Sequence, residues 1–403
     1  MVLGPGGSGV SVTAAAGALR TNAPARSTVL SIGDEHDTLL IALDPRSQLP
    51  AALGVYRVPG EPVAVTAGVD LLQVGQLDVV EDAWGEFTAA LAAAIGGRHL
   101  LPVVGTIASI APGEITGLPG IQEFLMLRRI RDAATSGRWR RIVVDLSGVG
   151  DPYALLRAPV ALSAAMERLW PRATRLAQAA EKPALAQLSA AIEGIDRDCQ
   201  DLTDLFADPH AVAGHLVLDA SERGRRAVAD HVAIAELTAF PLRSVQVSAG
   251  EFGASTAAVA DEVRGLLGDD DVVVAEVPSG GTLDRLSRLR RVPVQFAAPS
   301  GRPYGSGAMT VRRVSGEGVD SVFELAWRQG LPEPDRLQLG RSGDDLLVTV
   351  AGFRQPIRLP SVLRRCRVDG ADWSGGRLSV RLRPDPTLWP ARQGGTGAAP
   401  SSR

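Results

Sequence analysis

The strongest constraint on the fold is an alternation, through the first two-thirds of the chain, of short β-branched runs with longer Ala-, Leu- and Arg-rich stretches. Continuous apolar runs of strand length predict strands buried on both faces, and the stretches between them predict helices. This order is typical of α/β proteins with a mostly parallel sheet covered by helices on both faces. The predicted strands are Ser27–Ile32, Val69–Gln73, Arg141–Leu146, His215–Leu218, Val245–Val247 and Val272–Val277, and the predicted helices are Val10–Arg20, Ala83–Ile95, Ile121–Thr135, Glu222–Thr238 and Ser255–Leu267.

Two later parts of the chain depart from this alternation. Residues from about 161 to 207 carry Leu, Ala and Met at helical spacing without β-rich runs, so we predict a helical insertion within a first domain that spans 1–298. A Gly-, Pro- and Ser-rich stretch predicts a linker at 299–320, and the tail at 390–403 is expected to be disordered. Between linker and tail, at 321–389, short strands separated by turns predict a small antiparallel β-sandwich. Its strands are placed at Asp335–Leu339, Asp345–Val350, Gln355–Leu359, Arg364–Val368 and Arg377–Leu382.

Composition excludes several kinds of partner and site. The formal net charge of the 403 residues is −3, so the chain lacks the net positive charge that is typical of nucleic-acid-binding proteins. The two cysteines, Cys199 and Cys366, stand far apart, which argues against a disulfide scaffold and against a cysteine-based metal site. The five histidines show no close metal-ligand spacing, so no zinc is expected. No apolar run reaches the ~18 residues that cross a bilayer, and a reduced cytoplasmic location is the simplest interpretation.

The chain opens with the sequence MVLGPGGSGVSVTAAAGALR, which places a short apolar strand, a Gly-rich turn and an Ala-rich helix in succession. A phosphate-binding loop needs this context, because backbone N–H groups and the positive end of the helix converge there on phosphate oxygens. The consensus G-x-x-x-x-G-K-[ST] begins at Gly4 and finds Gly9 and Ser11 in place. The lysine position, however, holds Val10.

The segment GPGGSGVS resembles the deviant loop GKGGVGK[ST] of the ATPases of the arsenite-pump (ArsA) and tail-anchored-protein-targeting type. In that family one lysine reaches across a dimer interface to the partner's nucleotide, and Pro5 stands at its position. A second lysine contacts the β- and γ-phosphates, and Val10 stands there. The resemblance implies a degenerate Walker A site. Its cofactor-binding positions would be Gly4, Gly6, Gly7, Gly9, Val10 and Ser11.

Further motifs match the same family in the right order. The segment Leu118–Glu123 resembles the P-G-x-x-E start of a family helix, and Leu216–Asp219 with Glu222 resembles the strand and P-E helix after the family's insertion. Val143-Val144-Asp145 followed by Gly150 resembles the second switch. By this resemblance Asp145 and Ser11 would hold magnesium. The C-terminal block resembles the α-crystallin-like β-sandwich of some bacterial members.

The first switch, D-P-A-H-S-L in the family, has two candidates here. Asp34 with Leu39 lies closer to the distance that the family has between the loop and this motif. Asp44-Pro45 with Leu49 matches more residues of the motif but requires an insertion between the loop and the motif. We favour Asp34. Either carboxylate would act as the base or position the attacking water, and either is also a residue type that caps a helix at a strand-to-helix turn.

Three functions fit these observations. Loss of both lysines favours a pseudo-ATPase, a binding or regulatory subunit that forms a homo- or heterodimer with an active homologue and hydrolyses ATP weakly or not at all. A working ATPase of the same family is the second interpretation, since Ser11, Asp145 and a switch Asp remain. The third is a chaperone-like binder of hydrophobic client proteins through the helical insertion. ATP and Mg²⁺ are the implied cofactors, weakened or lost. The family's three-cysteine arsenite site is excluded because the chain has only two cysteines.

Overall fold

The computed structural model describes residues 1–20, 36–95, 111–115, 120–249, 255–268, 271–278, 285–330 and 336–389. These form two compact units. The first comprises Met1–His231 with Phe240–Pro303, and the second comprises Val232–Ala239 with the chain from Tyr304 onward. Each unit is described separately below.

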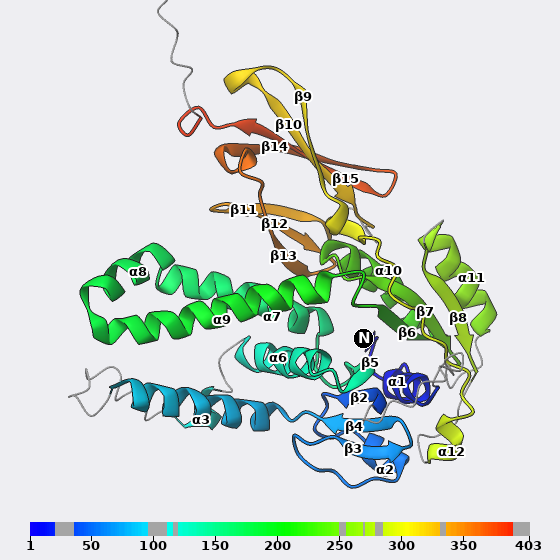
Figure 1. Ribbon diagram of the computed structural model, residues 1–403. Coiled ribbons are helices and arrows are strands. Elements are labelled where there is room, and N and C mark those ends of the chain that lie inside the picture. Colours follow the sequence, from blue (N-terminus) through cyan, green and yellow to red (C-terminus); the bar gives the residue numbers. More distant parts are fainter. Residues whose placement is uncertain are drawn as a thin grey trace, which may run out of the picture. The chain divides into compact units, whose positions relative to one another are not determined.

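An eight-stranded sheet forms the centre of the first unit, with helices on its two faces (Figure 1). The strand order is β3-β4-β2-β5-β1-β6-β7-β8, and neighbours are parallel except for the antiparallel pair β3–β4. This confirms the predicted α/β class with a mostly parallel sheet. The strands are β1 (Val2–Leu3), β2 (His36–Ala42), β3 (Val63–Thr66), β4 (Val69–Gln73), β5 (Trp139–Asp145), β6 (Gly214–Asp219), β7 (Leu242–Ser248) and β8 (Val273–Val277).

Helix α1 lies against one face of this sheet because its side chains are small. Ala14, Ala15 and Ala18 are fully buried in a cluster that includes Leu40 of β2 and Val143 of β5. Short side chains let the helix axis approach the strands closely, and this close approach positions the preceding turn at the end of β1. The described helices of this unit are α1 (Val10–Leu19), α2 (Leu49–Leu53), α3 (Gln76–Ile95), α5 (Pro112–Ile115), α6 (Ile121–Thr135), α7 (Pro152–Leu169), α8 (Arg172–Glu181), α9 (Pro183–Ala207), α11 (Thr256–Leu267) and α12 (Leu286–Leu289). Helix α10 (Glu222–Leu237) begins in this unit, and its residues from Val232 onward belong to the second.

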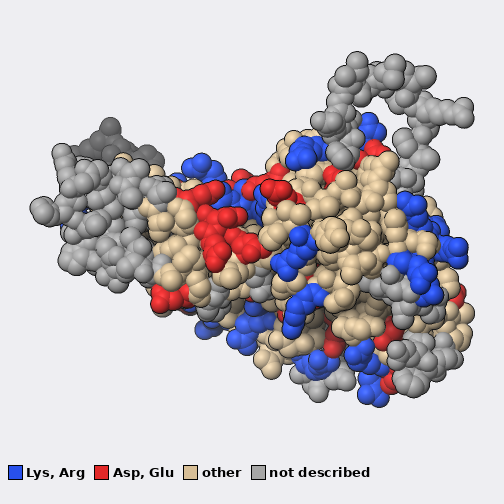
Figure 2. Space-filling view, turned by 90° about the horizontal axis from the view of Figure 1, so that it is seen from below, with Lys and Arg blue, Asp and Glu red and all other residues tan. Residues whose placement is uncertain are grey.

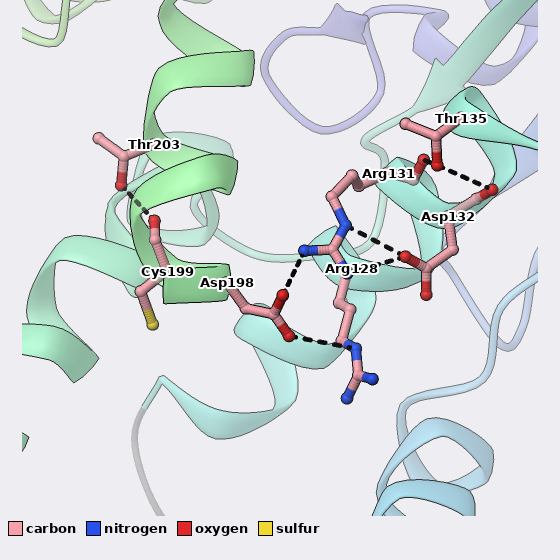
Figure 3. A network of polar contacts seen from close by, with 7 residues as sticks. All are labelled: Arg128, Arg131, Asp132, Thr135, Asp198, Cys199 and Thr203. Carbon is pink, nitrogen blue, oxygen red and sulfur yellow. Dashed lines mark hydrogen bonds and ion pairs between the residues drawn. The ribbon is translucent and has the colours of Figure 1, made fainter. Parts of the chain in front are cut away.

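Helices α7, α8 and α9 lie between β5 and β6 in the sequence, where a helical insertion is predicted at 161–207. The first of them starts earlier, at Pro152, with Asp151 as its N-cap. A polar network joins α9 to α6 (Figure 3). The Nη1 of Arg131 donates to Oδ1 of Asp198 at 2.7 Å, and the Nε of Arg128 lies 3.6 Å from Oδ2 of the same carboxylate. The insertion is therefore held to the sheet-covering helix α6 by a shared carboxylate.

Two antiparallel sheets make up the second unit. One has the order β14-β15-β10-β9 and the other β11-β12-β13. Alternate side chains of β15 are buried, as expected where one face of a strand covers a core. Trp327 of β10 is fully buried there. The strands are β9 (Thr310–Ser315), β10 (Val322–Arg328), β11 (Gln338–Ser342), β12 (Asp345–Val350), β13 (Phe353–Arg358), β14 (Cys366–Ser374) and β15 (Arg377–Pro384).

Most predicted elements are confirmed within one to four residues, and two differences bear on the site or the boundaries. The strand predicted at Ser27–Ile32 falls outside the described residues, as does the tail at 390–403. Strand β2, which the sequence prediction lacks, occupies His36–Ala42. The segment predicted as a linker contains β9, whose six residues are all exposed and give no apolar signal.

The described helices include none that is long and apolar enough to span a membrane. Figure 2 shows one face of the molecule, on which basic and acidic side chains are interspersed and several acidic side chains gather in one group. Among the residues coloured there, no continuous basic surface covers this face.

Candidate functional site

The backbone of the turn between β1 and α1 requires glycine at particular positions. Gly7 and Gly9 have φ angles of 84° and 91°, in the left-handed region that favours glycine. A Cβ on Gly4 would lie 2.1 Å from the carbonyl oxygen of Val217 in β6, so a side chain cannot fit there. By contrast, a Cβ on Gly6 would meet no described atom within 4 Å. The loop is therefore packed closely against β6 at Gly4, whereas there is open space beside Gly6.

The loop also contains polar groups without a hydrogen-bond partner among the described residues. Gly9 is the N-cap of α1, and within the described chain no side chain caps the first backbone N–H groups of this helix. Ser8 is 1% exposed, and its Oγ has no hydrogen-bond partner among the described residues. The Oγ of Ser248, at the end of β7, donates to the carbonyl oxygen of Ser8 at 2.8 Å and so holds the loop to the sheet. Uncapped N–H groups at a helix N-terminus favour binding of an anion.

The two positions where the resemblance expects lysine supply no charge. Val10 is 5% exposed and packs in the hydrophobic cluster with Val2 and Ala14, so its side chain belongs to the core. Pro5 has neither a charged side chain nor a backbone N–H, and its carbonyl oxygen accepts from the N–H of Ser8 at 3.1 Å. The loop keeps its shape, therefore, without either cation.

Ser11 and Asp145, the predicted metal positions, lie close together. The Oγ of Ser11 is 2.8 Å from the Oγ of Ser147, and the N–H of Ser147 donates to Oδ1 of Asp145 at 2.9 Å. Asp145 is 1% exposed, and its Oδ2 makes no hydrogen bond to any described residue. Burial raises the pKa of the Asp145 carboxyl, and hydrogen bonds from Ser147 and Ser11 oppose this only in part. A buried carboxylate oxygen without a donor is suited to a cation.

The structure places Asp44 beside these groups. It follows the carboxyl end of β2 by two residues, and its Oδ1 accepts from the N–H of Arg46 at 2.8 Å. A Cβ on Gly148 would lie 2.5 Å from the carboxyl carbon of Asp44, so this side chain lies against the backbone just after Asp145. The negative charge of Asp44 contributes to the raised pKa of Asp145. Asp34, the other first-switch candidate, lies outside the described residues.

Arg223, in the first turn of α10, reaches the loop and was not predicted as a site residue. Its Nη2 donates to the carbonyl oxygen of Gly6 at 2.7 Å and lies 3.3 Å from Oδ2 of Asp219. The side chain is 63% exposed. The resemblance does place a helix start at Glu222, but no local pattern links this helix to a loop 217 residues earlier. Ser147 and Ser248 were missed for the same reason.

A magnesium site here would need oxygens from a nucleotide as well as from the protein. Within the described chain no group of three or more His, Cys, Asp or Glu side chains is arranged to hold a metal ion. Mg²⁺ in nucleotide sites is commonly held by one or two protein oxygens together with phosphates and water. The Ser11 hydroxyl and the unpartnered Oδ2 of Asp145 fit that role. Ser11 and Asp145 therefore lie where the resemblance expects Mg²⁺ ligands, whereas Pro5 and Val10 supply no cation for phosphate.

Comparisons with known proteins identify the family of the chain. Residues 1–223 match the family model described as anion-transporting ATPase, and residues 323–382 match the HSP20-like domain found in ArsA. Protein Rv2184c of Mycobacterium tuberculosis is 32% identical, over 97% of each chain. Protein SCO2128 of Streptomyces coelicolor is 31% identical, over 97% of this chain and 98% of its own. A putative arsenical pump-driving ATPase of Chlorobaculum tepidum is 20% identical, over 86% of this chain and 89% of its own.

Proposed function

Because this chain belongs to the anion-transporting ATPase family, we propose that it is a pseudo-ATPase, a nucleotide-responsive subunit that has lost hydrolysis and acts by binding. The observation that carries the proposal is the placement of Val10. It occupies the lysine position at the first residue of α1, yet its side chain is buried in the core and has no donor. A cation on the transferring phosphoryl group is worth roughly 10³–10⁵ in rate, by analogy with arginine fingers. Loss of that charge removes most of the catalytic advantage.

The remaining parts of the site support binding of a nucleotide. The N–H groups at the start of α1 would orient the phosphates, and Ser11 with Asp145 would hold Mg²⁺. When bound, Mg²⁺ neutralises charge on the phosphate oxygens. Asp44, beside Gly148, is the carboxylate best placed to orient a water molecule, and we assign it the first-switch role in this proposal.

The proposal includes association with a second subunit of the same family. In that family the lysine at the position of Pro5 acts across a dimer interface, so a chain without it could still receive the lysine of an active partner. We place the protein in the reducing cytoplasm, which is supported by Cys199 and Cys366 both being free and buried. Light scattering of the purified chain, alone and mixed with a lysine-bearing homologue, tests the association.

The test of lost hydrolysis compares phosphate release by the natural chain with that of two lysine variants. Val10→Lys restores the cation within the subunit, and Pro5→Lys restores the one that reaches the partner. Val314→Lys adds the same charge at an exposed position of β9 and serves as the control. We expect little release from the natural chain and the control, and a gain in the Val10→Lys variant. Equal release from all four proteins at a level that depends on Mg²⁺ would contradict the proposal.

Because Val10 is buried, the Val10→Lys variant must also be checked for folding. Its thermal unfolding is compared with that of Pro5→Lys, whose site at the loop is less buried. If Val10→Lys unfolds, tighter nucleotide binding by Pro5→Lys than by the natural chain still supports a phosphate site that lacks its lysines. Absence of nucleotide binding in both the natural chain and a folded Val10→Lys protein would mean that the loop no longer accepts phosphate.

The helical insertion favours a second candidate function, the binding of hydrophobic client segments. Leu169, at the end of α7, is 86% exposed, and Leu176 of α8 is 48% exposed. Large apolar side chains exposed near one helix connection are suited to contact with a partner. Crosslinking to an apolar peptide from position 173, an exposed residue of α8, in chains with Leu169 and with Leu169→Ser tests this function. Capture that is unchanged in Leu169→Ser would remove the assignment of this surface.

A further inference from the structure

We propose that Arg223 supplies the phosphate-binding cation of this site in place of the missing lysines, so that the chain binds a nucleoside di- or triphosphate without hydrolysing it. The inference rests on the proposed function, in that it takes the loop after β1 to be a surviving phosphate site. It goes beyond that function by naming the residue that keeps binding while catalysis is lost.

The position of the Arg223 guanidinium carries this inference. Its Nη2 lies 2.7 Å from the carbonyl oxygen of Gly6 and would be 3.2 Å from a Cβ on Gly7, so it lies beside this part of the loop. Both of its contacts, to Gly6 and to Asp219, are made by Nη2. A guanidinium carries five N–H donors in a fork that matches phosphate, so an anion at the loop can be bound while the contact with Gly6 is kept.

The neighbouring arginines of α10 are directed elsewhere. The Nε of Arg225 donates to Glu262 of α11 at 2.9 Å, and the Nε of Arg226 donates to Glu222 at 2.9 Å. Lys182, the single lysine of the sequence, lies at the junction of α8 and α9. Arg223 is thus the member of this basic cluster that contacts the loop.

A second feature of the loop independently points to an anion. The Oγ of Ser8 is buried with no hydrogen-bond partner among the described residues, and it would lie 3.0 Å from a Cβ on Gly4. Burying a hydroxyl without a partner is costly, and a phosphate oxygen at the loop would satisfy it. Gly9, the N-cap of α1, supplies no side-chain cap to the N–H groups that follow it in the same turn.

The location of Arg223 also explains how the chain keeps nucleotide binding while it loses ATP hydrolysis. A lysine at the Val10 position would extend from the first turn of α1, whereas Arg223 approaches from α10 beside Gly6 and Gly7. From its position beside Gly6 and Gly7, the Arg223 guanidinium can neutralise the charge of a bound phosphate in the ground state. Interactions that are equally strong in the ground and transition states strengthen binding without accelerating the chemical step.

The test is calorimetric titration of the full chain with Mg-ATP, Mg-ADP and adenosine. Arg223→Ala should weaken binding of both nucleotides roughly tenfold, the order expected for one solvent-exposed charge-assisted contact, and Arg223→Lys should recover part of that loss. Adenosine, which has no phosphate, should bind equally to all variants. Arg226→Ala, on the same helix, is the matched control and should bind as the natural chain does. Arg223 is exposed, so thermal unfolding without nucleotide should be unchanged.

Equal nucleotide affinity in Arg223→Ala and the natural chain would overturn the inference. Nucleotide binding by Val10→Lys but not by the natural chain would also overturn the inference about Arg223. The proposed loss of hydrolysis would not be contradicted by that result. Conversely, Mg²⁺-dependent hydrolysis by the natural chain would remove the proposed function. An affinity loss confined to Arg223→Ala would still support the role of Arg223 in that case.

Discussion

The Oγ of Ser11 in α1 lies 2.8 Å from the Oγ of Ser147, and through Ser147 it is linked to the buried carboxylate of Asp145. This contact joins the phosphate loop to the segment after β5, which are 136 residues apart in sequence. The two residues that we propose as Mg²⁺ ligands, Ser11 and Asp145, therefore belong to one connected group. This group remains intact although the loop has lost both lysines.

Ser11→Ala should therefore remove the effect of Mg²⁺ on ATP binding. In the natural chain Mg²⁺ is expected to tighten binding, because Ser11 and Asp145 would provide protein oxygens to the ion. Titrations with and without Mg²⁺ measure this difference. Ser136→Ala, which changes an exposed serine at the end of α6, should keep the full Mg²⁺ effect. A Mg²⁺ effect of normal size in Ser11→Ala would exclude this hydroxyl as a ligand.

Asp145→Asn should stabilise the ligand-free protein at neutral pH by roughly 1–3 kcal/mol, the range for relieving a buried unsatisfied polar group. Burial raises the pKa of this carboxyl in the folded state above its ordinary value of 3.8. Its contribution to stability is therefore fully present below that ordinary pKa and is lost as pH rises through the folded pKa. The difference between variant and natural chain should grow as pH increases from about 4 to 7. Urea unfolding at a series of pH values measures it, and a pH-independent difference would contradict the assignment.

Gly4→Ala and Gly6→Ala form a matched pair of variants within the loop. The added methyl group at Gly4 would meet the carbonyl oxygen of Val217, so we expect a loss of roughly 1–3 kcal/mol in the free energy of unfolding. The same substitution at Gly6 meets open space and should change stability by less than about 0.5 kcal/mol. Chemical denaturation measures both. Equal losses would mean that the loop does not pack against β6.

The ion pair between Arg131 and Asp198 should couple α6 to α9 measurably. Their side chains are 17% and 29% exposed, and the guanidinium is also paired with Asp132. A double-mutant cycle on unfolding free energy should give a coupling of about 1 kcal/mol, since the pair is partly shielded from solvent. The exposed pair of Arg225 with Glu262 is the control and should give less than about 0.5 kcal/mol. Coupling at the control level would show that the shared carboxylate does not hold the insertion.

The sheet and most helices could be predicted because their signals are local. The apolar run before Asp145 and the helix pattern after Gly120 each give the element, and β5 and α6 occur where predicted. Strand β9 could not be found, because an exposed edge strand such as Thr310–Ser315 carries no buried apolar side. The strand before the first switch was predicted at Ser27–Ile32, and the choice between Asp34 and Asp44 depended on distance from the loop and on motif letters. The described strand β2 ends at Ala42, two residues before Asp44.

The site was predictable only where the residues lie along one segment. The loop glycines and Ser11 follow from the motif, and the left-handed φ angles of Gly7 and Gly9 give the physical reason for two of them. The partners of the loop come from other strands and helices. Arg223 meets Gly6 across 217 residues, so only the packing of β6 against β1 brings them together.

The most direct test of the central claim measures ATP binding and phosphate release on the same preparation of the full chain. The account predicts saturable Mg-ATP binding that weakens in Arg223→Ala, together with phosphate release no greater than that of an Asp145→Asn variant. Phosphate release by the natural chain that is clearly above that of Asp145→Asn would contradict it, because the site would then be a working ATPase without either lysine.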